Sequence, residues 1–171
     1  MIKSPVLYIF SGLPGVGKST LAKQLACEYG CTYLRIDTIE QALRDLCNYD
    51  VQGEGYRLSY RIATENLKNG MSVVADSCNP ISITRQEWSQ VAKDLSVSYL
   101  NIFITCSDKV EHKKRVETRT VLIPNLILPS WQDVINREFE TWTDAHIVLD
   151  TAAKTPLESF HELLSLVEKW N

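Results

Sequence analysis

The sequence of 171 residues lacks a long apolar run, because no stretch approaches the roughly 18 apolar residues that a membrane-spanning helix needs. It also lacks an excess of charge of one sign, and its net charge is only −3. An extended nucleic-acid surface normally makes a domain strongly basic. We therefore expect neither a membrane nor an extended nucleic acid as partner, although a small basic site is compatible with this charge. The N-terminal apolar run is too short for a secretion signal and is predicted to be a first strand.

Cysteine is scarce and scattered. The five cysteines form no Cys-x-x-Cys pair, and no histidine stands near them at metal-ligand spacing. This pattern argues against a disulfide framework and against a zinc site, and it favours reduced thiols in a cytoplasmic protein. The residues are Cys27, Cys31, Cys47, Cys78 and Cys106.

No internal repeat, low-complexity tract or flexible linker divides the chain, so we expect one domain over residues 1–171. Short β-branched runs alternate with segments of helical periodicity, which predicts an α/β fold with a five-stranded, mostly parallel sheet flanked by helices. The expected strands are residues 6–10, 32–36, 71–75, 98–105 and 145–149. Hydroxyl residues followed by an acid three positions later predict helix starts at Thr84, Ser130 and Thr155. Ligands of such sheets bind beyond the carboxyl ends of the strands.

A glycine-rich stretch, GLPGVGKST, follows the first expected strand and precedes a helical pattern. It fits G-x-x-x-x-G-K-[ST], in which bare backbone N–H groups surround phosphates at a helix N-terminus. Lys18 is expected to reach the β- and γ-phosphates of ATP, and the Ser19 hydroxyl is expected to bind Mg²⁺. The alternative is a plain glycine-rich turn with a solvated lysine. The nucleotide-binding residues predicted here are Gly12, Leu13, Pro14, Gly15, Val16, Gly17, Lys18, Ser19 and Thr20.

Two acids follow expected strands. Asp37, after the second strand, is placed to accept a proton from an acceptor hydroxyl, or it only caps the next helix together with Glu40. Asp76, at the end of the third strand, is a candidate to hold Mg²⁺ directly or through water, with an ordinary Asp-Ser turn as the alternative. No Asn-Lys-x-Asp segment indicates a GTPase, and the chain is short for a motor or helicase, so a small kinase is favoured.

A basic segment follows the fourth expected strand. Arg115 and Arg119 stand four residues apart, which places them on one face of a helix, and an irregular proline-containing stretch comes next. We expect residues 111–130 to form a short lid that closes over the phosphates. The alternative is a solvated helix face.

These stretches together make the chain similar to the small ATP-dependent P-loop kinases grouped with polynucleotide kinase, chloramphenicol phosphotransferase and the zeta toxins. The resemblance rests on GLPGVGKST, on RIDTI, on VVADSCNP with Arg85 beyond it, and on Arg115 and Arg119. It implies an adenylate-kinase-like fold with Asp37 as general base and Lys18 on the phosphates. It implies that Arg119 stabilises the transferring group and that the loop 150–154, including Thr151, lies near the adenine. Residues 137–142, REFETW, resemble a closing helix after the lid.

One position departs from that pattern. Polynucleotide kinase has an arginine three residues beyond its catalytic Asp, where it grips the acceptor's phosphate, whereas this chain has Glu40 there. We therefore expect an ATP- and Mg²⁺-dependent kinase that phosphorylates a hydroxyl of a small molecule. A kinase of nucleic-acid or nucleotide ends and a nucleotide-dependent switch without an acceptor are the alternatives. The segment 48–66 matches no known pattern, and no feature of the sequence predicts the oligomeric state.

Overall fold

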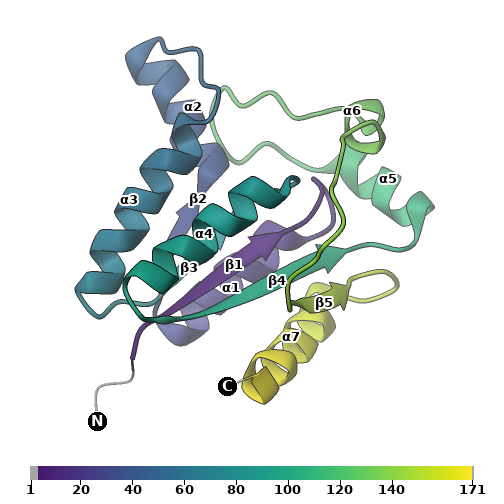
Figure 1. Cartoon of the computed structure of the whole chain (residues 1–171). Helices are drawn as coiled ribbons and strands as arrows, with labels where there is room; N and C mark the ends of the chain where they lie inside the picture. Colours follow the sequence, from purple (N-terminus) through teal and green to yellow (C-terminus); the bar gives the residue numbers. More distant parts are fainter. Residues whose placement is uncertain (1–3, 171) are drawn as a thin grey trace.

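Five parallel strands form one sheet in the order β2-β3-β1-β4-β5 (Figure 1). The computed structural model describes residues 4–170. The strands are β1 (Val6–Ser11), β2 (Thr32–Arg35), β3 (Val73–Asp76), β4 (Ser98–Thr105) and β5 (Ile147–Asp150). Each of the five expected strands is therefore present, and all the pairings are parallel.

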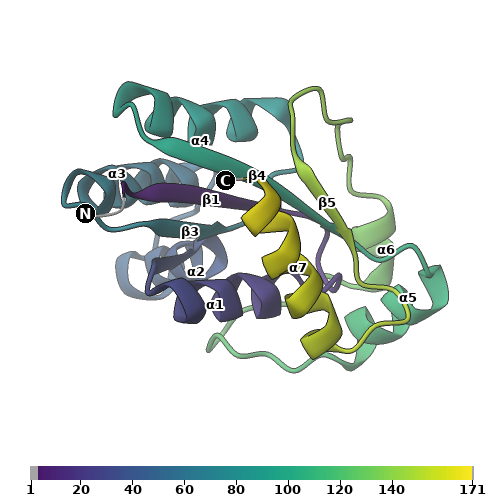
Figure 2. The same ribbon diagram turned by 90° about the horizontal axis from the view of Figure 1, so that it is seen from below.

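Helices cover both faces of the sheet, which is why the central strands have continuous apolar sequences. On one face, α1 (Lys18–Tyr29) and α7 (Pro156–Trp170) pack against Tyr8 and Phe10 of β1. On the other face, α3 (Glu54–Lys68) and α4 (Ser82–Asp94) pack against Leu7 and Ile9 (Figure 2). The single domain thus has three layers, with its core on both sides of β1.

The remaining helices are α2 (Ile36–Cys47), α5 (Lys109–Thr118) and α6 (Trp131–Ile135). Helix α2 starts directly after β2, and α5 starts a few residues after β4, so both begin beyond the carboxyl ends of the strands. The irregular segment 119–130 connects α5 to α6 and extends towards α2 (Figure 1). The side chain of Asn125 in this segment donates a hydrogen bond to Asp45 of α2 at 3.2 Å. The segment therefore spans the carboxyl edge of the sheet.

Two of the three expected helix starts are confirmed. Ser130 and Asp133 form a reciprocal capping box, and Thr155 forms the same arrangement with Glu158. The start at Thr84 is wrong, because α4 begins two residues earlier at Ser82. Segment 48–66, which matches no known sequence pattern, contains most of α3.

The closing helix expected over residues 137–142 is also wrong, because this segment contains no helix. Its polar groups bind the neighbouring α4 region instead: the backbone N–H of Glu140 donates to the Pro80 carbonyl at 2.8 Å, and its carboxylate accepts from the Ser82 N–H at 2.6 Å. The ring of Phe139 stacks on Phe103 of β4. These long-range contacts outweigh the local preference for a helix.

All five cysteines are free in the structure. None of the helices within residues 4–170 combines the length and apolar character needed to span a bilayer.

Candidate active site

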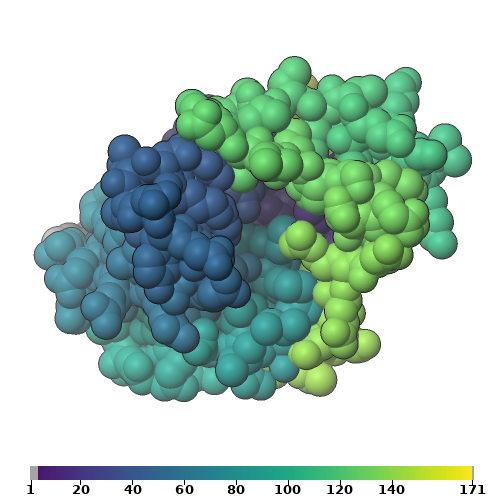
Figure 3. Space-filling view, turned by 90° about the horizontal axis from the view of Figure 1, so that it is seen from above, coloured from purple at the N-terminus to yellow at the C-terminus, as the bar shows by residue number. Residues whose placement is uncertain are grey.

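A cavity of about 760 Å³ opens beyond the carboxyl ends of the strands. Its walls are the glycine loop, the start of α2, the end of α5 and the segment 119–129. Seen from above, the molecule is hollowed between the dark blue α2 region and the green segment, with purple N-terminal residues at the bottom (Figure 3). The cavity lies where ligands of parallel sheets are expected.

The glycine loop, residues 12–17, forms the floor of this cavity between β1 and α1. Gly12 and Gly15 have positive φ values of 146° and 87°. A Cβ on Gly12 would lie 2.3 Å from the Ile104 carbonyl oxygen, and one on Gly15 would lie 2.5 Å from Cγ2 of Val116. Both glycines are therefore required by the close approach of the loop to β4 and α5.

Lys18 begins α1 and forms a buried ion pair with Asp76 at the end of β3. The distance from Nζ to Oδ1 is 2.6 Å, and the two side chains are 8% and 1% exposed. Burial opposes the charge of each group, but their mutual attraction outweighs it, so the pKa of Lys18 is raised and that of Asp76 is lowered. The Tyr33 hydroxyl donates to Oδ2 of Asp76 at 2.7 Å. The Asp-Ser turn alternative is thus inconsistent with this buried, paired carboxylate.

The residues at this point fit a magnesium ion. Oδ1 of Asp76 accepts a hydrogen bond from Lys18 and Oδ2 accepts one from Tyr33, whereas a carboxylate has about four acceptor sites. Ser19, the next residue after Lys18, lines the same cavity and adds to the effect of Lys18 in lowering the pKa of Asp76. Residues 4–170 contain no group of three or more His, Cys, Asp or Glu that would hold a metal by themselves. Mg²⁺ commonly needs only one or two protein oxygens, with phosphates and water completing its shell.

Asp37 lines the same cavity from the first turn of α2. The interpretation of Asp37 as a helix cap is wrong, because α2 begins at Ile36 and its N-cap residue is Arg35, without a side-chain capping bond. The carboxylate instead lies 3.6 Å from the Arg35 guanidinium, and it is 46% exposed. Asp37 is therefore accessible to a ligand.

Arg119 also lines the cavity, but the expectation that it shares a helix face with Arg115 is wrong. Helix α5 ends at Thr118, and Arg119 has an extended backbone. Its side chain donates to the Pro129 carbonyl at 3.1 Å, while its buried Nε has no hydrogen-bond partner among the residues described. Burial lowers the pKa of Arg119, although the nearby charge of Asp37 opposes this shift. Arg119 thus lines the cavity with a guanidinium whose buried Nε lacks a partner among the residues described.

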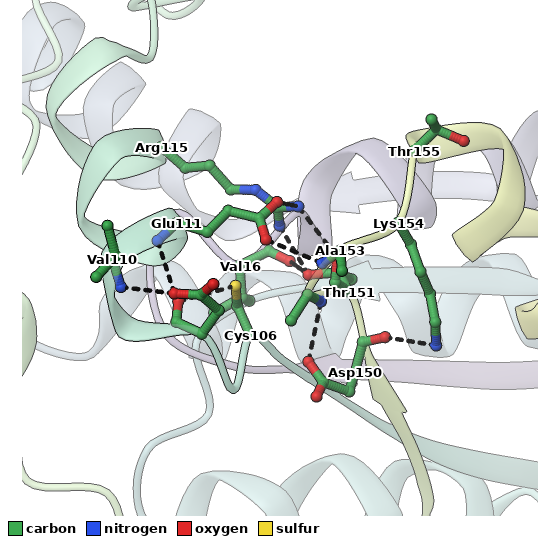
Figure 4. Close-up of polar contacts among 12 residues, drawn as sticks. Val16, Cys106, Val110, Glu111, Arg115, Asp150, Thr151, Ala153, Lys154 and Thr155 are labelled. Atoms are coloured by element: carbon green, nitrogen blue, oxygen red, sulfur yellow. Dashed lines mark hydrogen bonds and ion pairs between the residues drawn. The ribbon is translucent and has the colours of Figure 1, made fainter.

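Arg115 is held by the loop after β5 (Figure 4). Its guanidinium donates to the Thr151 hydroxyl at 2.8 Å and to the Thr151 carbonyl at 3.0 Å, and it pairs with Glu111. Arg115 and Thr151, with Gly17 and Thr20, line a second cavity of about 260 Å³. This smaller cavity continues from the glycine loop towards the C-terminal helix, because Lys154 and Pro156 also line it.

A third cavity, of about 450 Å³, adjoins the first on the other side. The two share four lining residues, which are Asp37, Glu40, Cys78 and Arg137. Burial raises the pKa of Glu40, and its partner Arg44 offsets part of this shift. Asp37 therefore lies where the two spaces meet.

Several residues of the site were not predicted from the sequence. Tyr33, Arg35 and Arg137 carried no recognised signal, although Arg35 stands within RIDTI. One residue named from the sequence, Arg85, does not line these cavities, because its side chain is buried against Trp142.

The sequence matches the profile of the family described as "AAA domain" over residues 7–122. It is 27% identical to the L-seryl-tRNA(Sec) kinase of Methanococcus maripaludis, over 97% of this chain and 68% of that protein. The fold is similar to that of the Mycobacterium tuberculosis APS kinase solved with AMPPNP and APS (TM-score 0.63, 20% identity, 96% of this chain and 98% of that one). It is also similar to a gluconokinase from Sinorhizobium meliloti (TM-score 0.68, 16% identity, 98% and 94%). These relatives are kinases, and they do not confirm the resemblance to the polynucleotide kinase, chloramphenicol phosphotransferase and zeta toxin group in particular.

We predict that Asp76→Asn destabilises the ligand-free protein by about 3–5 kcal/mol, because it leaves the Lys18 charge buried without its partner. Urea unfolding at neutral pH measures this loss, with the exposed Asp94→Asn as control. The lowered pKa of Asp76 means that the pair stabilises the fold above the ordinary value of 3.8 and loses this effect as the pH falls. The difference between wild type and Asp76→Asn should therefore shrink in acid. If the difference in unfolding free energy between the two proteins stayed constant down to the pH of acid unfolding, the ion pair would be contradicted.

Proposed function

The chain belongs to the AAA domain family, and on that premise we propose that it is an ATP- and Mg²⁺-dependent kinase that phosphorylates a hydroxyl of a small molecule. One observation carries the proposal: Lys18 of the glycine loop, Asp37 and Arg119 line the same cavity. A phosphate donor on the loop and an acceptor at Asp37 would therefore meet in one space. The five free thiols support our proposal that the protein works in the cytoplasm.

The nucleotide is held from two sides in this proposal. Backbone N–H groups of residues 12–17 and the N-terminus of α1 bind the phosphates. The ammonium of Lys18 has three donors, so it can keep Asp76 and still reach a phosphate oxygen. Ser19 and Asp76 would hold Mg²⁺, which would supply positive charge next to the β- and γ-phosphates. The smaller cavity beside Thr151 receives the base.

Phosphoryl transfer then needs a base and a charge stabiliser on the acceptor side. Asp37 accepts the proton of the acceptor hydroxyl, whose oxygen forms a bond to the γ-phosphorus while the bond from that phosphorus to the bridging oxygen of ADP breaks. Arg119 donates to the oxygens of the group in transfer, and its unpartnered Nε supports this role. The segment 111–130 acts as the lid that excludes water.

Asp37→Asn tests the base. We expect acceptor-dependent ADP release from a pool of hydroxyl-bearing metabolites to fall roughly 100-fold or more, because Asn keeps the shape and cannot take the proton. MgATP affinity and thermal stability should stay near the wild-type values.

The exposed Asp50→Asn serves as the matched control and should keep full activity. Unchanged turnover in Asp37→Asn would refute the base assignment. Turnover that does not depend on any acceptor would favour a nucleotide-dependent switch instead.

Arg119→Ala is expected to lower kcat roughly 100-fold with little change in the affinity for ATP, since its contact strengthens as charge moves during transfer. Arg119→Lys should recover little, because a single ammonium cannot replace the guanidinium fork. Steady-state kinetics of both variants measure this, and Lys113→Ala, on the exposed side of α5, is the control. If Arg, Lys and Ala at position 119 gave equal kinetics, Arg119 would have no role in phosphoryl transfer and would be only a solvated residue of the lid.

A second candidate function is phosphorylation of an acceptor attached to RNA, which the similarity to a seryl-tRNA kinase favours. That relative is longer, and this chain spans 68% of it. The net charge of −3 and the carboxylates Asp37 and Glu40 in the cavity argue against an RNA backbone here.

We accordingly predict no salt-dependent binding of tRNA or single-stranded oligonucleotides near physiological salt, and no labelling of their hydroxyl groups by ATP. Fluorescence anisotropy at two salt concentrations measures the binding. Micromolar affinity that weakens steeply with salt, together with RNA phosphorylation, would replace the small-molecule acceptor by RNA.

A further inference from the structure

The acceptor side of the site contains a charged residue, Arg137, to which no role has been assigned. Arg137 lines both the nucleotide cavity and the adjoining third cavity, and it shares this position with Asp37. Tyr56 and Thr84, from α3 and α4, line the far part of the third cavity. An acceptor that fills this space and presents its hydroxyl to Asp37 would therefore pass beside Arg137.

The other charges around this space have partners within the protein. Arg35 lies 3.6 Å from Asp37, Arg44 lies 3.5 Å from Glu40, and Arg57 lies 4.0 Å from Glu54. Burial raises the pKa of the Tyr60 hydroxyl, and the nearby charge of Glu87 adds to this shift. The hydroxyl donates to the Thr84 carbonyl at 3.4 Å.

Arg137 differs from these residues. Within residues 4–170, its side chain makes no ion pair and no hydrogen bond that meets the usual distances. Its positive charge is therefore available to a ligand.

The backbone around Arg137 is fixed although its side chain is exposed. On one side, Val134 of α6 is 1% exposed. On the other side, the buried Arg85 donates to the Glu140 carbonyl at 2.8 Å and to the Pro80 carbonyl at 3.2 Å, and its guanidinium lies 4.5 Å from the Trp142 ring. These contacts of Arg85 hold the backbone at Glu140, three residues after Arg137. The position of Arg137 at the mouth of the third cavity is thus set by packing and hydrogen bonds rather than by a free loop.

We propose that Arg137 binds an anionic group of the acceptor, which is then a small molecule with a hydroxyl near a carboxylate or a phosphate. This inference rests on the proposed kinase function. A guanidinium can bind two oxygens of such a group at once. Without that contact, Asp37, Glu40 and the ATP phosphates would repel an anionic acceptor from this space.

Binding of a small anion tests the inference without catalysis. The enzyme is saturated with Mg²⁺ and AMPPNP, a non-hydrolysable ATP analogue, so that the phosphate sites of the glycine loop are filled. Inorganic phosphate and glycerate are then titrated by calorimetry. Wild type and the control Arg61→Ala, on the exposed surface of α3, should bind at least one probe, and Arg137→Ala should bind it about 10-fold more weakly or worse. Equal affinity in all three proteins, or no binding by wild type, would overturn the proposal.

Kinetics with paired acceptors provide the second arm. Glycerate and glycerol 3-phosphate each carry a hydroxyl and an anion, and glycerol lacks the anion. We expect phosphorylation of a charged member in preference to glycerol, and which of the two is used distinguishes a carboxylate from a phosphate. Arg137→Ala should raise the KM of that acceptor about 10-fold with the KM of ATP unchanged.

A rise in the KM of ATP instead would assign Arg137 to the nucleotide and overturn the proposal. Phosphorylation of glycerol at the same rate as the charged acceptors would also overturn the proposal. Failure of the kinase function would appear separately, either as an absence of MgAMPPNP binding or as ADP release that does not depend on any acceptor. The phosphate titration without nucleotide would then still show whether an anion site depends on Arg137.

Discussion

The buried ion pair between Lys18 and Asp76 is the interaction on which the rest of the site depends. It joins the start of α1 to the end of β3, two segments 58 residues apart in the sequence. Neither charge is stable alone at this depth, so each requires the other, and Tyr33 adds a hydrogen bond to the same carboxylate. The pair therefore fixes the glycine loop against the carboxyl edge of the sheet before any nucleotide arrives.

The lid region is attached to this edge at one end and free of secondary structure at the other. His112 of α5 lies 2.8 Å from the Pro14 carbonyl through its Nε2 and packs edge-on against Trp131. Arg115 is tied to Thr151 in the loop after β5. Helix α5 is thus coupled directly to the glycine loop and to the proposed base pocket, whereas residues 119–130 have no helix or strand and the Asn125 side chain among them donates to Asp45 of α2. In the proposed mechanism, this segment is the part that opens and closes over the phosphates.

The charged residues around the cavities differ in whether they have an ion-pair partner within the protein. Most charged residues around the cavities have partners close by, and those pairs orient Asp37 and Glu40. Arg119 and Arg137 have no carboxylate within 4 Å among residues 4–170. In the proposed mechanism, these two cations face the two anionic reactants: Arg119 the transferring phosphoryl group and Arg137 the acceptor. Asp37 lines the first cavity together with both arginines, and it lines the third cavity together with Arg137.

The sequence by itself determined the features that depend on short spacings. The order of strands and helices followed from apolar periodicity, and the glycine loop with Lys18 and Ser19 followed from a motif of eight residues. Asp76 could be predicted because it ends a strand. Only the tertiary structure decided that Tyr33 binds Asp76, that Arg119 lies outside α5, and that residues 137–142 form no helix. These outcomes depend on contacts between segments far apart in the chain, such as Arg85 with Glu140, which local sequence patterns do not encode.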